Sequence, residues 1–128
     1  MIIYNYSREY QTSDVSELER IMSARHKNGM NEVLLTHDGH RFPLLSIQMR
    51  DDIATLHYMV EGDRAGFTSI GGKLGLPPDE DTVFGTGTPD EKIWITNDAV
   101  VPFATALMAA KEFFQSEQLP RSIKWLEL

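Results

Sequence analysis

Alternation of apolar and polar residues predicts strands through much of the chain. In residues 53–60, every second side chain from Ala54 to Val60 falls on one strand face, and we expect this set to face the core. Asp38-Gly39 and Asp51-Asp52 are turn dipeptides, so the middle of the chain is predicted to form an antiparallel meander. The other predicted strands cover residues 2–6, 32–37, 42–49, 67–70, 82–86, 92–96 and 122–128.

Apolar residues three or four positions apart predict two helices. The first covers residues 14–25, with Asp14 as the N-cap, Glu17 placed for a capping box, and Asn28-Gly29 just beyond its end. The second runs from about Pro102, a residue suited to a first helical turn, to Ser116. The expected buried faces consist of Val15, Leu18, Ile21 and Met22 in the first helix and Phe103, Ala106, Leu107, Ala110 and Phe114 in the second.

This order of elements predicts an α+β fold. We expect a single antiparallel sheet of about six to eight strands, with two helices packed on one face, and one domain over residues 1–128. The last strand should join the sheet, because Ile123, Trp125 and Leu126 are costly to leave in water.

Composition narrows the possible functions. Twelve Lys and Arg stand against nineteen Asp and Glu, so the net charge of −7 disfavours direct nucleic-acid binding and favours a basic protein partner. The chain contains no cysteine, which excludes disulfides and thiolate metal sites. The first residues lack the pattern of a secretory signal, and no apolar run is long enough to span a membrane. We therefore expect a cytoplasmic protein.

The residues that invite a catalytic interpretation do not assemble into a known site. His37 and His40 flank the Asp-Gly turn and could converge, but a metal site needs further ligands and a second shell, so a surface hairpin is favoured. The segment Gly66–Leu74 is one residue too long for a phosphate-binding loop and lacks its Ser or Thr. The chain also offers no nucleophile with an evident base. We predict no catalytic residue, no metal site and no cofactor.

Two features suggest a surface that binds a partner. Trp94 lies opposite two buried isoleucines in an alternating strand, beside Lys92 and Thr96, and could anchor a partner or pack under a crossing loop. The Gly- and Pro-rich loop of residues 71–81 ends in three carboxylates and is either a negative patch for a basic groove or a solvated acidic loop. The candidate partner-binding residues are Asp79, Glu80, Asp81, Glu61, Asp63 and Trp94.

The order of several short motifs resembles a known family. These are Leu56-His-Tyr58, Ala65-Gly-Phe67-Thr-Ser-Ile-Gly71, a helix with a late Phe, a Leu-Pro break, and the ending Ile123-Lys-Trp125-Leu-Glu127. From about Glu32 onward the chain resembles the first immunity-protein family of bacterial polymorphic toxin systems. It departs from the family at Gln118, where members often carry glycine. The resemblance implies an α+β inhibitor encoded beside its toxin, often a nucleic-acid deaminase, with Trp125 and Glu127 marking the fold rather than the contact surface.

The function predicted from the residues and the resemblance together is inhibition by binding. We expect an immunity protein that neutralises a cognate secreted toxin, a basic nucleic-acid deaminase, by occluding its active-site cleft. The alternative is a small-ligand or regulatory module without catalysis, which would use a pocket between the sheet and the helices.

Overall fold

A computed structural model describes residues 1–62, 64–71 and 73–128 of the chain. Its elements are β1 (Ile2–Tyr4), β2 (Glu9–Gln11), α1 (Val15–Ser23), β3 (Met30–Thr36), β4 (Leu44–Arg50), β5 (Ile53–Met59), β6 (Phe67–Ser69), β7 (Asp81–Gly85), β8 (Lys92–Thr96), the short 3₁₀ helix η1 (Asn97–Ala99), β9 (Val101–Pro102), α2 (Phe103–Ser116) and β10 (Trp125–Glu127).

An eight-stranded antiparallel sheet forms the centre of the molecule. Its order is β10-β6-β5-β4-β3-β1-β2, and β9 pairs with the start of β5. The three seven-residue strands β3, β4 and β5 lie side by side in the middle, with Val33 opposite Ile47 and Ile47 opposite Leu56. The last strand, β10, joins the edge beside β6, as predicted. The α+β class is confirmed.

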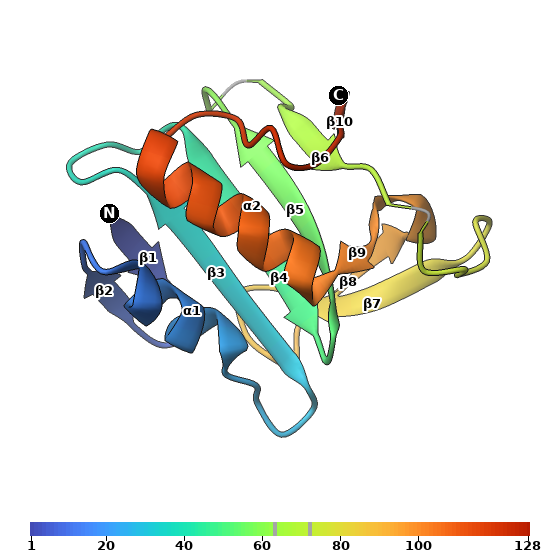
Figure 1. Ribbon diagram of the computed structural model, residues 1–128. Coiled ribbons are helices and arrows are strands. Elements are labelled where there is room, and N and C mark those ends of the chain that lie inside the picture. Colours follow the sequence, from blue (N-terminus) through green and yellow to red (C-terminus); the bar gives the residue numbers. More distant parts are fainter. Residues whose placement is uncertain (63, 72) are drawn as a thin grey trace.

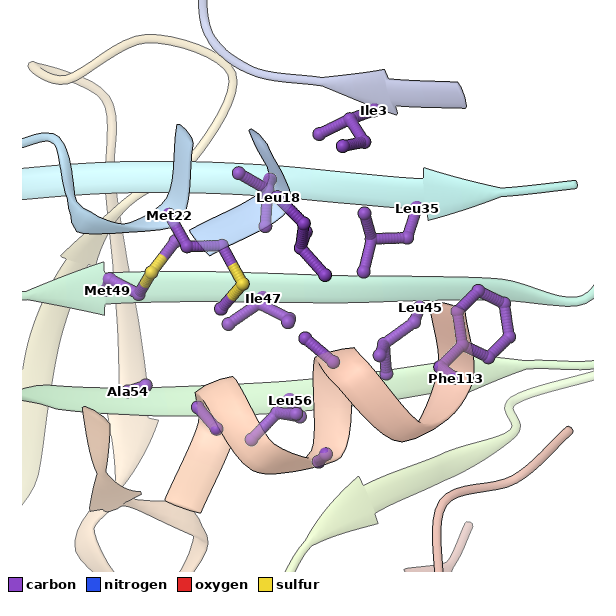
Figure 2. Packing of buried hydrophobic residues seen from close by; sticks show 14 of the residues in the cluster. Ile3, Leu18, Met22, Leu35, Leu45, Ile47, Met49, Ala54, Leu56 and Phe113 are labelled. Atoms are coloured by element: carbon purple, nitrogen blue, oxygen red, sulfur yellow. The ribbon is translucent and has the colours of Figure 1, made fainter. Parts of the chain in front are cut away.

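Both helices lie across the same face of this sheet (Figure 1). The carboxylate of Asp14 accepts a hydrogen bond from the backbone N–H of Ser16 at 2.9 Å, so the predicted N-cap of α1 is present. Leu18 and Met22 of α1 face Ile47 and Met49 of the sheet in a single apolar cluster (Figure 2). In the part of the chain that the structure describes, neither helix is long and apolar enough to cross a membrane.

The predicted core faces are largely correct. Ala54, Leu56 and Tyr58 of β5 are buried, whereas Val60 lies beyond the end of the strand and is 39% exposed. In α2 the fully buried aromatic residue is Phe113, and Phe114 packs only at the edge of the core. The buried positions Ala106, Ala109 and Ala110 have short side chains, which let α2 approach the sheet closely.

Several local features differ from the predictions. The helix α1 stops at Ser23, where the guanidinium of Arg25 donates to the carbonyls of Met22 and Ala24 and so takes up its free end. The turn at Asp38-Gly39 is part of a longer loop, because Thr36 already pairs with Leu44. A short strand, β2, pairs with β1 at the edge of the sheet and was not predicted.

The largest difference concerns the hairpin of β7 and β8. It forms a separate two-stranded sheet rather than two more strands of the main one. It packs against β3 and β4, whose other face carries the helices. Its strands were recognised correctly, but alternation alone does not say which sheet a strand joins.

Candidate functional site

The hairpin is held against the sheet at its turn by a buried carboxylate. Glu32 of β3 is only 7% exposed. Its two oxygens accept hydrogen bonds from the hydroxyl of Thr86 at 2.8 Å, the backbone N–H of Gly87 at 3.0 Å and the amide of Gln48 at 2.8 Å. A carboxylate satisfied by three donors forms strong, directional bonds, so Glu32 sets the orientation of the turn.

Two further contacts support the same end of the hairpin. The hydroxyl of Tyr6 donates to the carbonyl of Gly85 at 2.7 Å, and the amide of Asn28 donates to the carbonyl of Pro89 at 2.8 Å. Burial, followed by the nearby charge of Glu32, raises the pKa of Tyr6 well above its ordinary value. The tyrosine therefore keeps its proton and remains a donor.

The open end of the hairpin is fixed by Asn97. This residue is 6% exposed and follows β8 directly. Its side-chain amide donates to the carbonyl of Pro77 at 2.8 Å, and its side-chain oxygen accepts from the hydroxyl of Thr82 at 2.5 Å. Its backbone N–H donates to the backbone carbonyl of Glu80 at 3.0 Å. Asn97 thus ties the loop before β7 to the end of β8, which positions the acidic residues of that loop.

Trp94 lies in the middle of the outer face of the hairpin. It pairs with Val83, and its side chain is 62% exposed. Its neighbours Ile93 and Ile95 face inward, where they line a cavity between the hairpin and the sheet. The alternation predicted from the sequence is therefore confirmed. The exposure of Trp94 also contradicts the alternative in which a crossing loop covers it.

The three predicted loop carboxylates lie at the open end of the same hairpin. Asp79, Glu80 and Asp81 are all exposed. Asp81 pairs with Thr96, two positions along β8 from Trp94, so it shares the outer face with the tryptophan. The structure therefore brings together the two candidate features that sequence reasoning treated separately.

Three more exposed carboxylates belong to this element and were not predicted as site residues. Asp90 and Glu91 lie at its turn, and Asp98 lies in η1, where it accepts from the hydroxyl of Thr96 at 2.5 Å. We call residues 79–98 the acidic hairpin. It contains six carboxylates and one lysine, a net charge of −5, compared with −7 for the whole chain. The signal was available in the sequence once the two strands were taken as one unit.

The remaining two candidates do not join this site. Glu61 follows the far end of β5, where Met59 pairs with Leu44. The acidic hairpin instead meets the start of β5, where the hydroxyl of Thr55 donates to the carbonyl of Ala99 at 3.1 Å. Glu61 also forms an ion pair with Arg64 at 3.4 Å. Asp63 lies outside the described residues. Glu61 therefore follows the end of β5 opposite to the one that the acidic hairpin meets.

The histidines at the Asp-Gly turn make structural contacts. The rings of His37 and His40 stack with centroids 5.0 Å apart, and Nδ1 of His37 contacts the carboxylate of Glu117 at the end of α2. Among the described residues, no three His, Asp or Glu side chains are grouped closely enough to hold a metal ion. The predicted convergence of the two histidines is confirmed, and their contacts tie the β3–β4 loop to α2.

Trp125 contributes to the fold, as the family resemblance implied. Its ring packs at the edge of the core near Tyr58, and its indole N–H donates to the carbonyl of Pro120 at 2.8 Å. This bond joins β10 to the break after α2. Trp125 therefore stabilises the C-terminal segment.

Comparison with known proteins identifies the family. Residues 9–127 match the family described as immunity protein Imm1. The chain is also 28% identical over 124 residues to a double-stranded DNA deaminase immunity protein of Burkholderia cenocepacia (strain H111), with 97% of each chain covered. The chain therefore belongs to the Imm1 family of immunity proteins.

Proposed function

We propose that this immunity protein binds a cognate secreted toxin, a nucleic-acid deaminase, and neutralises it by covering its basic active-site cleft. The observation that carries the proposal is the exposed Trp94, centred on a hairpin that carries five of the seven net negative charges. The inhibitor acts by occupying the cleft and carries out no reaction. It acts in the cytoplasm, where such a toxin meets its substrate.

The charge of the acidic hairpin suits the expected partner. An enzyme that acts on nucleic acid must attract a polyanion, so its substrate cleft is positively charged. Carboxylates at both ends of the hairpin match such a cleft and accelerate association by electrostatic steering. The relative named above is an immunity protein for a deaminase of double-stranded DNA, which supports a deaminase as the partner class.

Trp94 supplies the apolar part of the proposed interface. Tight interfaces have a few buried anchors, often Trp, Tyr or Arg, surrounded by a polar rim that excludes water. Trp94 has acidic residues toward both ends of its hairpin. The anchors at Glu32 and Asn97 hold the hairpin in place before the partner arrives, which lowers the entropic cost of binding.

The first test is protection. The C-terminal domain encoded by the gene directly upstream is expressed in a susceptible bacterium with and without this protein, and the purified pair is analysed by size-exclusion chromatography. We expect rescue of growth and a stoichiometric complex. Rescue without any complex, even at high concentrations of both proteins, would contradict inhibition by binding.

The second test locates the surface. Reversal of charge at Asp79, Glu80 and Asp81 to Lys should slow association with the toxin domain by about tenfold or more at low salt. The matched control reverses Glu9, Glu17 and Glu19 to Lys, which changes the net charge equally but lies on β2 and α1. Equal slowing by both triple variants would mean that net charge, and not the acidic hairpin, directs the encounter.

A further inference from the structure

A cavity of about 430 Å³ lies beside the segments that follow β6 and precede β10, at the start of α2. Its walls come from the segment after β6, from β9 and the first turn of α2, and from the segment before β10. This is a pocket between the sheet and a helix, the kind of place where a small-ligand module would hold its ligand. We call it the basic pocket.

Three cationic residues line the basic pocket. These are Lys73, Arg121 and Lys124, and no carboxylate among the described residues lines it. None of the three forms an ion pair with another residue in the described parts of the chain. All three residues are exposed, so the cavity presents positive charge to solvent. In a protein of net charge −7 this arrangement indicates that an anion belongs there.

The walls of the basic pocket are held in place by the rest of the fold. The carboxylate of Glu112 accepts from the backbone N–H groups of Arg121 at 2.6 Å and Ser122 at 3.0 Å. These bonds keep the pKa of Glu112 below its usual range, so it remains a charged acceptor for this loop. The backbone N–H of Ile70 donates to the carbonyl of Lys124 at 3.0 Å, which joins the opposite walls. The pocket is therefore built before any ligand arrives.

Position 71 shows how closely the chain is packed at this wall. A Cβ atom at Gly71 would lie 1.9 Å from the carbonyl oxygen of Val100, so only glycine fits there. This close approach lets the backbone N–H of Gly71 donate to the carbonyl of Asp98 at 2.6 Å. The wall that carries Lys73 is thereby fixed to η1.

The other lining groups also suit an anion with an organic body. Thr105 and Ser122 line the pocket and bear hydroxyl groups. Thr105 lies in the first turn of α2, whose N-cap residue, Pro102, makes no side-chain cap, so the positive end of the helix dipole adds to the cations. Ile70 and Ile123 supply apolar surface at the same cavity.

We propose that the basic pocket binds a small organic phosphate monoester, with the phosphate on Lys73, Arg121 and Lys124 and the organic body against Ile70 and Ile123. A phosphate monoester carries nearly two negative charges and three acceptor oxygens near neutral pH, which matches three cations better than a single carboxylate does. The cavity is of the size that encloses small ligands. Ile70 and Lys73 belong to the segment 66–74, which fails the phosphate-loop pattern, so the proposed site rests on side-chain cations and not on a glycine-rich loop.

The test is calorimetric titration of the purified protein with three probes. Adenosine monophosphate supplies both the phosphate group and the organic moiety. Inorganic phosphate supplies only the anion, and adenosine supplies only the organic moiety. We expect the monophosphate to bind most tightly, with an affinity that falls as salt is added. No binding of the monophosphate at millimolar concentrations, or equal binding of either partial probe, would overturn the proposal.

Paired variants assign the binding to this pocket. The double change Arg121→Gln and Lys124→Gln should weaken monophosphate binding at least about tenfold. The control, Lys27→Gln with Arg41→Gln, removes the same charge from exposed cations elsewhere and should leave the affinity within about twofold. Circular dichroism checks that both variants are folded. Equal weakening in the two variants, or none in the first, would show that the basic pocket is not the site.

Discussion

The two faces of the central sheet are covered in physically different ways. On one face, α1 and α2 cover an apolar layer in which Leu35, Ile47 and Leu56 are essentially inaccessible to water (Figure 2). On the other, the acidic hairpin is attached through the carboxylate of Glu32 and the hydroxyl of Tyr6, together with the fully buried ring of Phe84. The first covering contributes mainly apolar burial, whereas the second adds directional hydrogen bonds to the burial of the Phe84 ring.

This difference assigns most of the stability to the helix-covered face and the proposed recognition to the acidic hairpin. Burial of apolar surface is non-directional and stabilises the whole domain, whereas hydrogen bonds contribute less net free energy but fix the orientation of what they hold. The outer residues of the acidic hairpin can therefore change with the partner while the fold remains intact. Variants on each face should therefore differ in how much they change the free energy of unfolding.

The largest loss of stability is expected on the face of the sheet that α1 and α2 cover. Phe113→Ala should lower the free energy of unfolding by about 3–5 kcal/mol, because it removes a fully buried aromatic ring and leaves a cavity between α2 and the sheet. Denaturant unfolding measures this change. The control is Met108→Ala on the same helix, which is 61% exposed and should change stability by less than about 0.5 kcal/mol. Similar losses in both variants would mean that α2 is less firmly packed than the structure indicates.

The helix face is also the part of the fold that sequence reasoning predicted best. Burial of Leu56 and Tyr58 follows from alternation in β5, and the N-cap at Asp14 follows from local chemistry at the start of α1. Both patterns are short-range. The buried face of α2 was harder to predict, because Phe113 and Phe114 are adjacent and either could face the core.

The hairpin face depends on contacts that are distant in sequence. Glu32 stands directly before the apolar run Val33-Leu34-Leu35, and two of the groups that satisfy it, Thr86 and Gly87, are more than 50 residues away. Nothing local marks such a carboxylate as an anchor. The exposure of Trp94 was predictable from alternation in β8, but its association with Asp81 depended on the pairing of β7 with β8.

Loss of the buried carboxylate should give the second-largest effect. Glu32→Ala should lower the free energy of unfolding by roughly 2–3 kcal/mol, because donors from Gln48, Thr86 and Gly87 lose a charged acceptor. Amide exchange should rise more at the hairpin turn than in the core strands. Faster exchange spread evenly over the sheet would contradict the role of Glu32 as a local anchor.

A smaller effect is expected at Tyr6. Tyr6→Phe removes one hydrogen bond to Gly85 and should cost about 1 kcal/mol at neutral pH. The pKa of Tyr6 is higher in the folded protein than the 10.0 of an unperturbed tyrosine, so the folded state retains the proton to higher pH. The free energy of unfolding should therefore decline as the pH rises above 10, and less steeply in Tyr6→Phe. Parallel alkaline profiles for the two proteins would contradict this assignment. Tyr58, whose pKa is also raised by burial, contributes equally to both profiles.

The smallest effect on stability should come from the residue with the largest proposed effect on recognition. Trp94→Ala should change the free energy of unfolding by less than about 0.5 kcal/mol, because most of the side chain is already in water. Its affinity for the toxin domain should nevertheless fall by about 2 kcal/mol or more, as expected for a central anchor, chiefly through faster dissociation. Ile95→Ala is the matched control on the same strand, since its side chain faces the sheet and lies away from the proposed contact surface. If Trp94→Ala destabilised the fold while binding was retained, Trp94 would help to attach the hairpin, as Glu32 does. The assignment of recognition to the outer face of the hairpin would then be wrong.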